Sequence, residues 1–171
     1  MSSILKVSSI QDPTNSNTAL TIDSSGRVTT PSVPAWRVSL NATQSVSATG
    51  YTQVQLDLTS TENCFLNGGV TISSYEVVVP ITGIYAVHSY VRVDGVGTGY
   101  VQLGILVNGV RLGVSDSFSI EGSPPSNYTT INASDVFSVT ANDTFRLEVY
   151  TSNDNSYTIN GNTVFSGHLV G

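Results

Sequence analysis

The sequence predicts an all-β protein, and its composition and its turn spacing carry that prediction. Only 11% of the 171 residues are charged and 39% are apolar, while Ser, Thr, Asn and Gly fill most of the remainder. This composition favours strands and turns over surface helices. From residue 35 onward, short apolar runs alternate with turn sequences such as Asn67-Gly68-Gly69 and Asn108-Gly109, without helical gaps. Such spacing is typical of an antiparallel sandwich or jelly roll.

Residues 1–33 form a polar arm that differs from the rest of the chain. Within it, Leu20–Ile22 and Arg27–Thr29 flank Asp23-Ser24-Ser25-Gly26, whose glycine can supply the positive φ of a hairpin turn. A lone two-stranded hairpin is marginal in water, so we expect other chains to order this arm. Prolines at 31 and 34 indicate an extended linker and place a domain boundary near residue 34. The apolar residues expected to contact other chains are Leu5, Val7, Leu20, Ile22 and Val28.

Residues 34–171 contain about ten strand-like runs, which suit one domain with a full core. The expected strands are Trp36–Leu40, Thr52–Leu58, Cys64–Ile72, Tyr75–Val79, Ile84–Val93, Gly99–Val107, Val110–Ser115, Thr129–Val139, Thr144–Thr151 and Thr163–Val170.

The most apolar stretch is Tyr75–Val93, two strands folded back through a turn at Pro80–Gly83. In its second strand one alternating set should face the core: Tyr85, Val87, Ser89, Val91 and Val93. The opposite set, which includes Ala86, His88 and Tyr90, is only half polar. We therefore expect both faces of this strand to be covered, one of them by a partner subunit.

Several function classes are disfavoured. A net charge of −6, with six scattered Lys and Arg residues, cannot supply the phosphate-neutralising patch that nucleic-acid binding needs. No segment has the length of a membrane span, and the N-terminal residues lack the pattern of a secretion signal. The two histidines, His88 and His168, do not stand in a zinc-binding spacing. We expect no catalytic residue, no cofactor and no metal ligand.

Two tyrosines are candidates for ligand contact. Among the eight in the chain, Tyr128 and Tyr157 fall in the polar segments Ser-Pro-Pro-Ser-Asn-Tyr and Asn-Asp-Asn-Ser-Tyr. An exposed aromatic ring in a polar loop can stack on a sugar or anchor a protein contact.

Four segments carry a resemblance to the jelly-roll domains of the C1q and tumour-necrosis-factor family. They are Gly83–His88, Val107–Gly109, Val136–Leu147 and Val164–Leu169, the last containing FSGHL. The resemblance covers residues 34–171 and implies a homotrimer of ten-stranded antiparallel jelly rolls, each with one sheet near the three-fold axis. Related trimeric heads can carry calcium, but no Asp-rich loop with calcium spacing occurs here. Asn142 replaces a frequent glycine and His168 a frequent apolar residue.

The arm is similar to the opening segments of tailed-bacteriophage fibre and appendage proteins, through LKVSSIQ and ALTIDSSGRVTTP. Together the two resemblances imply a non-enzymatic structural virion protein, made in the host cytoplasm. Its arm would bind other virion proteins, and its adhesive head would attach to a host-surface glycan or protein. A capsid decoration or head-fibre protein is the alternative within this class. A glycan-degrading enzyme is the alternative from another class, since acidic pairs such as Asp135 and Asp143 could meet its need for two carboxylates.

The same family resemblance places three strands on one sheet beside the three-fold axis. Alternation turns Phe145, Leu147, Val149, Phe165 and Leu169 toward the core. The outward residues expected at the trimer interface are His88, Tyr90, Arg146, Glu148, Tyr150 and His168.

Overall fold

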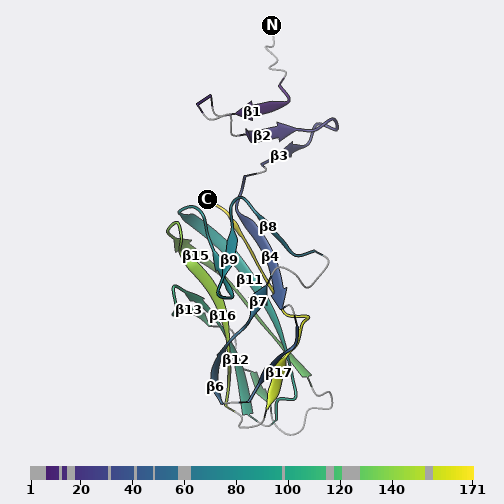
Figure 1. The fold of residues 1–171 in the computed structure, drawn as a ribbon, viewed down its shortest axis with the longest axis vertical. Helices are drawn as coiled ribbons and strands as arrows, with labels where there is room; N and C mark the ends of the chain where they lie inside the picture. The colour runs from purple at the N-terminus through teal and green to yellow at the C-terminus, as the bar shows by residue number, and fades with distance from the viewer. Residues whose placement is uncertain are drawn as a thin grey trace. The chain divides into compact units, whose positions relative to one another are not determined.

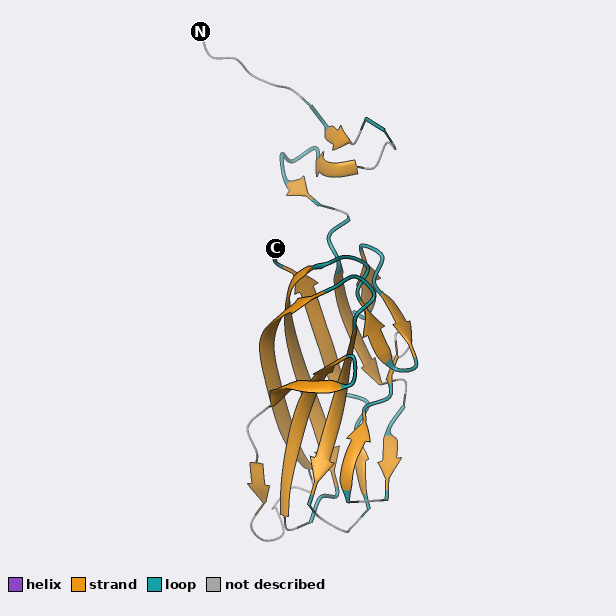
Figure 2. Ribbon diagram, turned by 90° about the vertical axis from the view of Figure 1, so that its left-hand side faces the viewer, coloured by secondary structure: helices purple, strands orange, loops and turns teal. Residues whose placement is uncertain are grey.

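The computed structural model describes residues 7–11, 13–14, 18–30, 32–40, 42–47, 49–57, 63–97, 99–114, 118–120, 128–152 and 156–171. The chain divides into two compact units, Met1–Val33 and Pro34–Gly171, at the proline-containing segment where its composition changes. Every secondary-structure element in the described ranges is a strand paired antiparallel (Figure 2). The all-β character expected from the composition is confirmed. No helix that could span a membrane occurs in this part of the chain.

The first unit is a small three-stranded sheet made of β1 (Ser9–Gln11), β2 (Thr18–Ile22) and β3 (Val28–Thr29). The predicted turn at Asp23 is confirmed, with Gly26 at a φ of 79°. The Asp23 carboxylate accepts hydrogen bonds from the backbone N–H groups of Arg27 (2.9 Å) and Ser25 (2.8 Å) and pairs with the Arg27 Nε at 2.6 Å. The backbone and side-chain hydrogen bonds from Arg27 lower the pKa of Asp23.

No described side chain between Val7 and Thr30 is buried, and Val28 is 62% exposed. The first unit therefore lacks an apolar core of its own among these residues. Leu5, one of the expected contact residues, lies outside the described residues.

The second unit, hereafter the head, is built from two antiparallel sheets on one core (Figure 1). In the seven-stranded sheet the order is β13-β12-β16-β10-β9, with β14 beside β12 and β6 beside β16. In the eight-stranded sheet it is β5-β17-β11-β18-β4-β7, with β15 beside β11 and β8 beside β4. The bounds are β4 (Ala35–Leu40), β5 (Gln44–Val46), β6 (Gly50–Gln53), β7 (Leu56–Asp57), β8 (Phe65–Asn67), β9 (Thr71–Ser73), β10 (Glu76–Val78), β11 (Gly83–Asp94), β12 (Gly99–Val107), β13 (Val110–Val114), β14 (Phe118–Ile120), β15 (Tyr128–Val139), β16 (Thr144–Thr151), β17 (Tyr157–Ile159) and β18 (Val164–Leu169).

Most of the predicted runs are present, but several are divided. The run Cys64–Ile72 is interrupted by Gly68 and Gly69, which both have positive φ, so that β8 joins one sheet and β9 the other. The Asn108-Gly109 turn has positive φ at both residues (49° and 76°), as a tight hairpin of the primed type requires. Asn142 takes the left-handed conformation that glycine would otherwise supply, with a φ of 73°.

The core lies between the sheets and is centred on Trp36, which is 1% exposed. Its ring centroid lies 5.7 Å from that of Phe145 on the seven-stranded sheet and 5.7 Å from that of Phe165 on the eight-stranded sheet. Tyr85 completes this cluster, 6.0 Å from Trp36. The aromatic cluster therefore joins the inner faces of both sheets.

The inward-facing residues predicted from alternation are confirmed in three strands. Tyr85, Val87, Ser89, Val91 and Val93 are all buried, as are Phe145, Leu147, Val149 and Phe165. Leu169 is half-buried and packs against the same core. The expectation that all three strands share one sheet is wrong, because β11 and β18 belong to the eight-stranded sheet and β16 to the seven-stranded sheet.

Candidate functional site

The outer face of the eight-stranded sheet carries several exposed apolar side chains. Antiparallel pairing aligns Val136, Ala86, His168 and Ala35 in one row across β15, β11, β18 and β4. Exposed apolar side chains lie in or beside that row, and they are Phe65 (47%), Ile84 (44%), Tyr90 (36%), Val136 (59%) and Val170 (55%). These five side chains are aliphatic or aromatic and carry no charge, so their exposed area gains free energy when another surface covers it.

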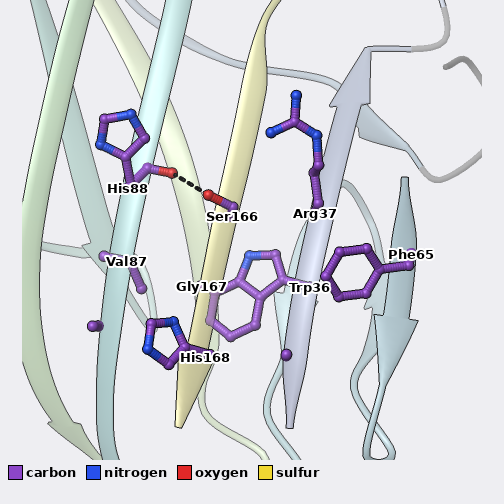
Figure 3. A pocket seen from close by; sticks show the side chains of 10 residues that line it. Trp36, Arg37, Phe65, Val87, His88, Ser166, Gly167 and His168 are labelled. Carbon is purple, nitrogen blue, oxygen red and sulfur yellow. Dashed lines mark hydrogen bonds between the residues drawn. The ribbon is translucent and has the colours of Figure 1, made fainter. Parts of the chain in front are cut away.

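A shallow groove of about 480 Å³ crosses this face over β4, β18 and β11. Figure 3 shows His88, Ser166, Arg37 and Phe65 on neighbouring strands along it, with His168 nearer its other end. Its lining is mostly apolar. On β18, Gly167 lies opposite Trp36 on β4. The indole packs so closely on the Gly167 backbone that an added Cβ atom would overlap the ring.

The histidines of the groove hold ordinary polar contacts. His88 Nδ1 lies 2.9 Å from Ser134 Oγ on β15, and Ser166 Oγ donates to the backbone carbonyl oxygen of His88 over 3.4 Å (Figure 3). His168 is exposed on β18. Among the residues that the structure describes, no group of three or more His, Cys, Asp or Glu side chains could hold a metal ion.

Half of the predicted interface set lies on the opposite side of the head. His88, Tyr90 and His168 point outward from the eight-stranded sheet, whereas Arg146, Glu148 and Tyr150 point outward from the seven-stranded sheet. The six residues therefore cannot form one patch on one subunit. Alternation had predicted correctly that each of them faces outward, but it carries no information about which sheet a strand joins.

The outer face of the seven-stranded sheet carries a network of ion pairs. Glu148 pairs with Arg111 at 2.9 Å and with Arg146 at 2.7 Å, and Arg146 also reaches Glu76 at 3.4 Å. Arg111 comes from β13 and must cross β12 to reach Glu148 on β16. It crosses at Gly104, where an added Cβ would lie 2.7 Å from the Arg111 Nε.

Beside this network lies a cluster of three tyrosines, Tyr51, Tyr100 and Tyr150, hereafter the tyrosine cluster. The ring centroids of Tyr51 and Tyr150 are 4.7 Å apart, and those of Tyr100 and Tyr150 are 5.3 Å apart. Tyr51 is 57% exposed and Tyr100 41%. The Arg111 guanidinium carbon lies 3.7 Å from the Tyr51 ring centroid, a cation–π contact. Interaction with the Tyr100 hydroxyl raises the pKa of Tyr150.

Sequence reasoning missed the tyrosine cluster because its members come from strands far apart in the chain. Tyr51 is on β6, Tyr100 on β12 and Tyr150 on β16. Only the pairing of β6 and β12 on either side of β16 brings them together. No local pattern in the sequence could have shown that.

The two predicted ligand-contact tyrosines differ. Tyr128 is 49% exposed at the start of β15, and the Arg92 guanidinium lies 4.2 Å from its ring centroid. The exposure expected for Tyr157 is wrong: it is 2% exposed, because β17 pairs with both β5 and β11 and turns this side chain inward. Burial raises the pKa of Tyr157. Tyr128 alone of this pair can meet a ligand.

No protein-family model and no curated protein matches this sequence.

Proposed function

We propose that the protein is a non-enzymatic structural protein of a tailed-bacteriophage virion, a homotrimeric appendage with a jelly-roll head. The observation that carries the proposal is the exposed aliphatic face of the eight-stranded sheet. The family resemblance implies that one sheet of each subunit lies beside a three-fold axis. The eight-stranded sheet contains both of the segments that most specifically resemble the family, on β11 and β18. A face with this apolar content suits permanent subunit contact.

Strand connectivity supports the jelly-roll architecture. Along the chain, β10 lies in the seven-stranded sheet, β11 in the eight-stranded sheet and β12 in the seven-stranded sheet again. The same alternation repeats from β15 to β16 and on to β18. Consecutive strands that cross between two packed sheets are what nested Greek keys produce.

The arm supports attachment to other proteins. It forms a separate compact unit in which no described residue is buried, and a three-stranded sheet without a core is too small to be stable by itself. Contacts with neighbouring virion proteins would supply the missing burial. The residues that would make them include Leu20, Ile22 and Val28.

Truncation of the arm tests this role. A chain that starts at Pro34 is expected to remain soluble and to keep the oligomeric state of the full chain, because the whole core lies in residues 34–171. The same chain should no longer be incorporated into phage particles, as measured by quantitative mass spectrometry of purified virions. Incorporation of the truncated chain at the level of the full chain would contradict the attachment role.

A further inference from the structure

We propose that the tyrosine cluster on the seven-stranded sheet is a saccharide-binding site, with Tyr51, Tyr100 and Tyr150 as its stacking surface. This inference rests on the proposed adhesive function and gives it a location and a ligand class. The site is distinct from Tyr128, the candidate that the sequence had suggested, and it lies on the sheet opposite the proposed subunit interface.

The chemistry of this patch fits a sugar ring. A pyranose presents a face of C–H groups, which packs on the electron-rich face of an aromatic ring, and a rim of hydroxyls, which need hydrogen-bond partners. The tyrosine cluster supplies three rings that pack against one another, with centroid separations of 4.7 and 5.3 Å and interplanar angles of 53° and 28°; Tyr51 (57%) and Tyr100 (41%) are well exposed. A sugar ring would stack on the exposed parts of Tyr51 and Tyr100, with Tyr150 between them and packed against both rings.

The surroundings of the rings supply the polar partners. On the same face, Gln53 lies opposite Glu148 in the β6–β16 register, and its amide nitrogen donates to the Ser74 carbonyl oxygen over 3.0 Å, which holds the side chain in place. The Arg111 guanidinium is held between Glu148 and the Tyr51 ring, which fixes its position before any ligand arrives. Pre-ordered planar donors of this kind reduce the entropic cost of binding.

The contrast between the two outer faces favours a saccharide here over a protein. The eight-stranded sheet exposes aliphatic side chains such as Ile84 and Val136, which suit a dry protein contact. Around the tyrosine cluster the neighbouring outward positions include Gln53 and Glu148, and the exposed aliphatic side chains of this sheet, Val110 and Leu112, lie on the edge strand β13. A wet, hydrogen-bonding ligand with small apolar faces is complementary to that mixture, whereas a large apolar surface is not.

The position of the cluster also fits a contact with an external ligand. β11 begins beside Gly171, where the Ile84 N–H donates a hydrogen bond to the Gly171 carbonyl oxygen. At the same end, the Leu169 N–H donates to the carbonyl oxygen of Pro34. β11 then runs the length of the head to Asp94, just before β12 begins at Gly99. β6 and the start of β12 accordingly lie at the end of the head opposite the C-terminus (Figure 1). The tyrosines are thus remote from the residue at which the arm leaves the head.

Binding of the full-length protein to an array of immobilised bacterial capsular polysaccharides and O-antigens tests the inference. We expect binding to at least one of these polysaccharides. With oligosaccharides cut from that polymer, calorimetry should show affinity reduced about ten-fold or more by Tyr51→Ala or Tyr150→Ala, because each change removes a stacking ring. Tyr150→Phe keeps the ring and should bind more tightly than Tyr150→Ala. The folding of each variant is checked by far-UV circular dichroism.

Tyr128→Ala tests the competing location that the sequence suggested, since Tyr128 is also an exposed tyrosine in contact with an arginine. It should leave the affinity unchanged. Three outcomes would overturn the inference. The protein could bind no polysaccharide, or it could bind only envelope proteins whose sugars have been oxidised with periodate. In the third outcome, Tyr128→Ala abolishes binding and Tyr51→Ala does not.

The failures of the two proposals can be told apart. If the full chain is trimeric and enters virions but binds no polysaccharide, only the saccharide site is wrong. If it binds sugar through the tyrosine cluster but never enters virions, only the virion role is wrong. Shortened polysaccharide chains recovered after incubation would contradict the non-enzymatic proposal.

Discussion

Replacing Trp36 with alanine is expected to lower the free energy of unfolding of the head by about 3–5 kcal/mol, the usual cost of removing a large buried aromatic ring. Trp36 is 1% exposed and packs against Tyr85, Phe145 and Phe165, so its loss would leave a cavity between the two sheets. Because those partners belong to both sheets, the surrounding structure cannot easily collapse into the space.

Urea unfolding followed by far-UV circular dichroism measures this effect, since Trp36 is the only tryptophan and the variant loses its fluorescence signal. All proteins are compared at one chain concentration, because oligomer stability depends on it. Trp36→Phe, which keeps a ring, should cost clearly less than Trp36→Ala. A loss below about 1 kcal/mol for Trp36→Ala, at an unchanged urea slope, would contradict the central place given to this residue.

Gly167→Ala is expected to destabilise the head by about 1–3 kcal/mol, although it adds a single methyl group. The added Cβ would overlap the Trp36 indole, a rigid ring already enclosed by the core, so either the ring or strand β18 must move. Gly161→Ala is the matched control. It has nothing within 4 Å of the added atom, and its effect should stay within about 0.5 kcal/mol.

A double-mutant cycle separates the overlap from other effects of Gly167→Ala. In a Trp36→Phe background the smaller ring leaves room for the methyl group, so the cost of Gly167→Ala should fall. An equal cost in both backgrounds would mean that the destabilisation does not come from contact between these two residues.

Alternation in the sequence was sufficient to predict which side chains face inward on the long strands. Tyr85 to Val93 and Phe145 to Val149 are buried in the predicted sets because successive side chains of a strand point to opposite faces, and one face of each strand packs on the core. Turn chemistry likewise predicted the tight turns at Gly26 and Asn108-Gly109, where positive φ is needed. Both signals are local and depend on neighbouring residues alone.

The assignment of strands to sheets could not be predicted in this way. Phe145 and Phe165 both face the core, but from opposite sheets, and inward alternation is the same in either case. The family resemblance placed these strands on one sheet and so grouped Arg146, Glu148 and Tyr150 with the histidines, and alternation could not correct that error. Tyr157 was misassigned for a related reason: a three-residue strand between polar segments gives too short a pattern to distinguish it from a loop.

Light scattering of the purified full-length protein tests the central claim most directly. We predict a mass about three times the 18.0 kDa of the chain. Val136→Glu should shift it toward the mass of one chain, because each subunit would bury an unpaired carboxylate at the interface. Val110→Glu is the matched control, since Val110 on the seven-stranded sheet is 58% exposed and Val136 59%. A wild-type monomer at micromolar concentration, or a trimer that Val136→Glu leaves intact, would contradict association through the eight-stranded sheet.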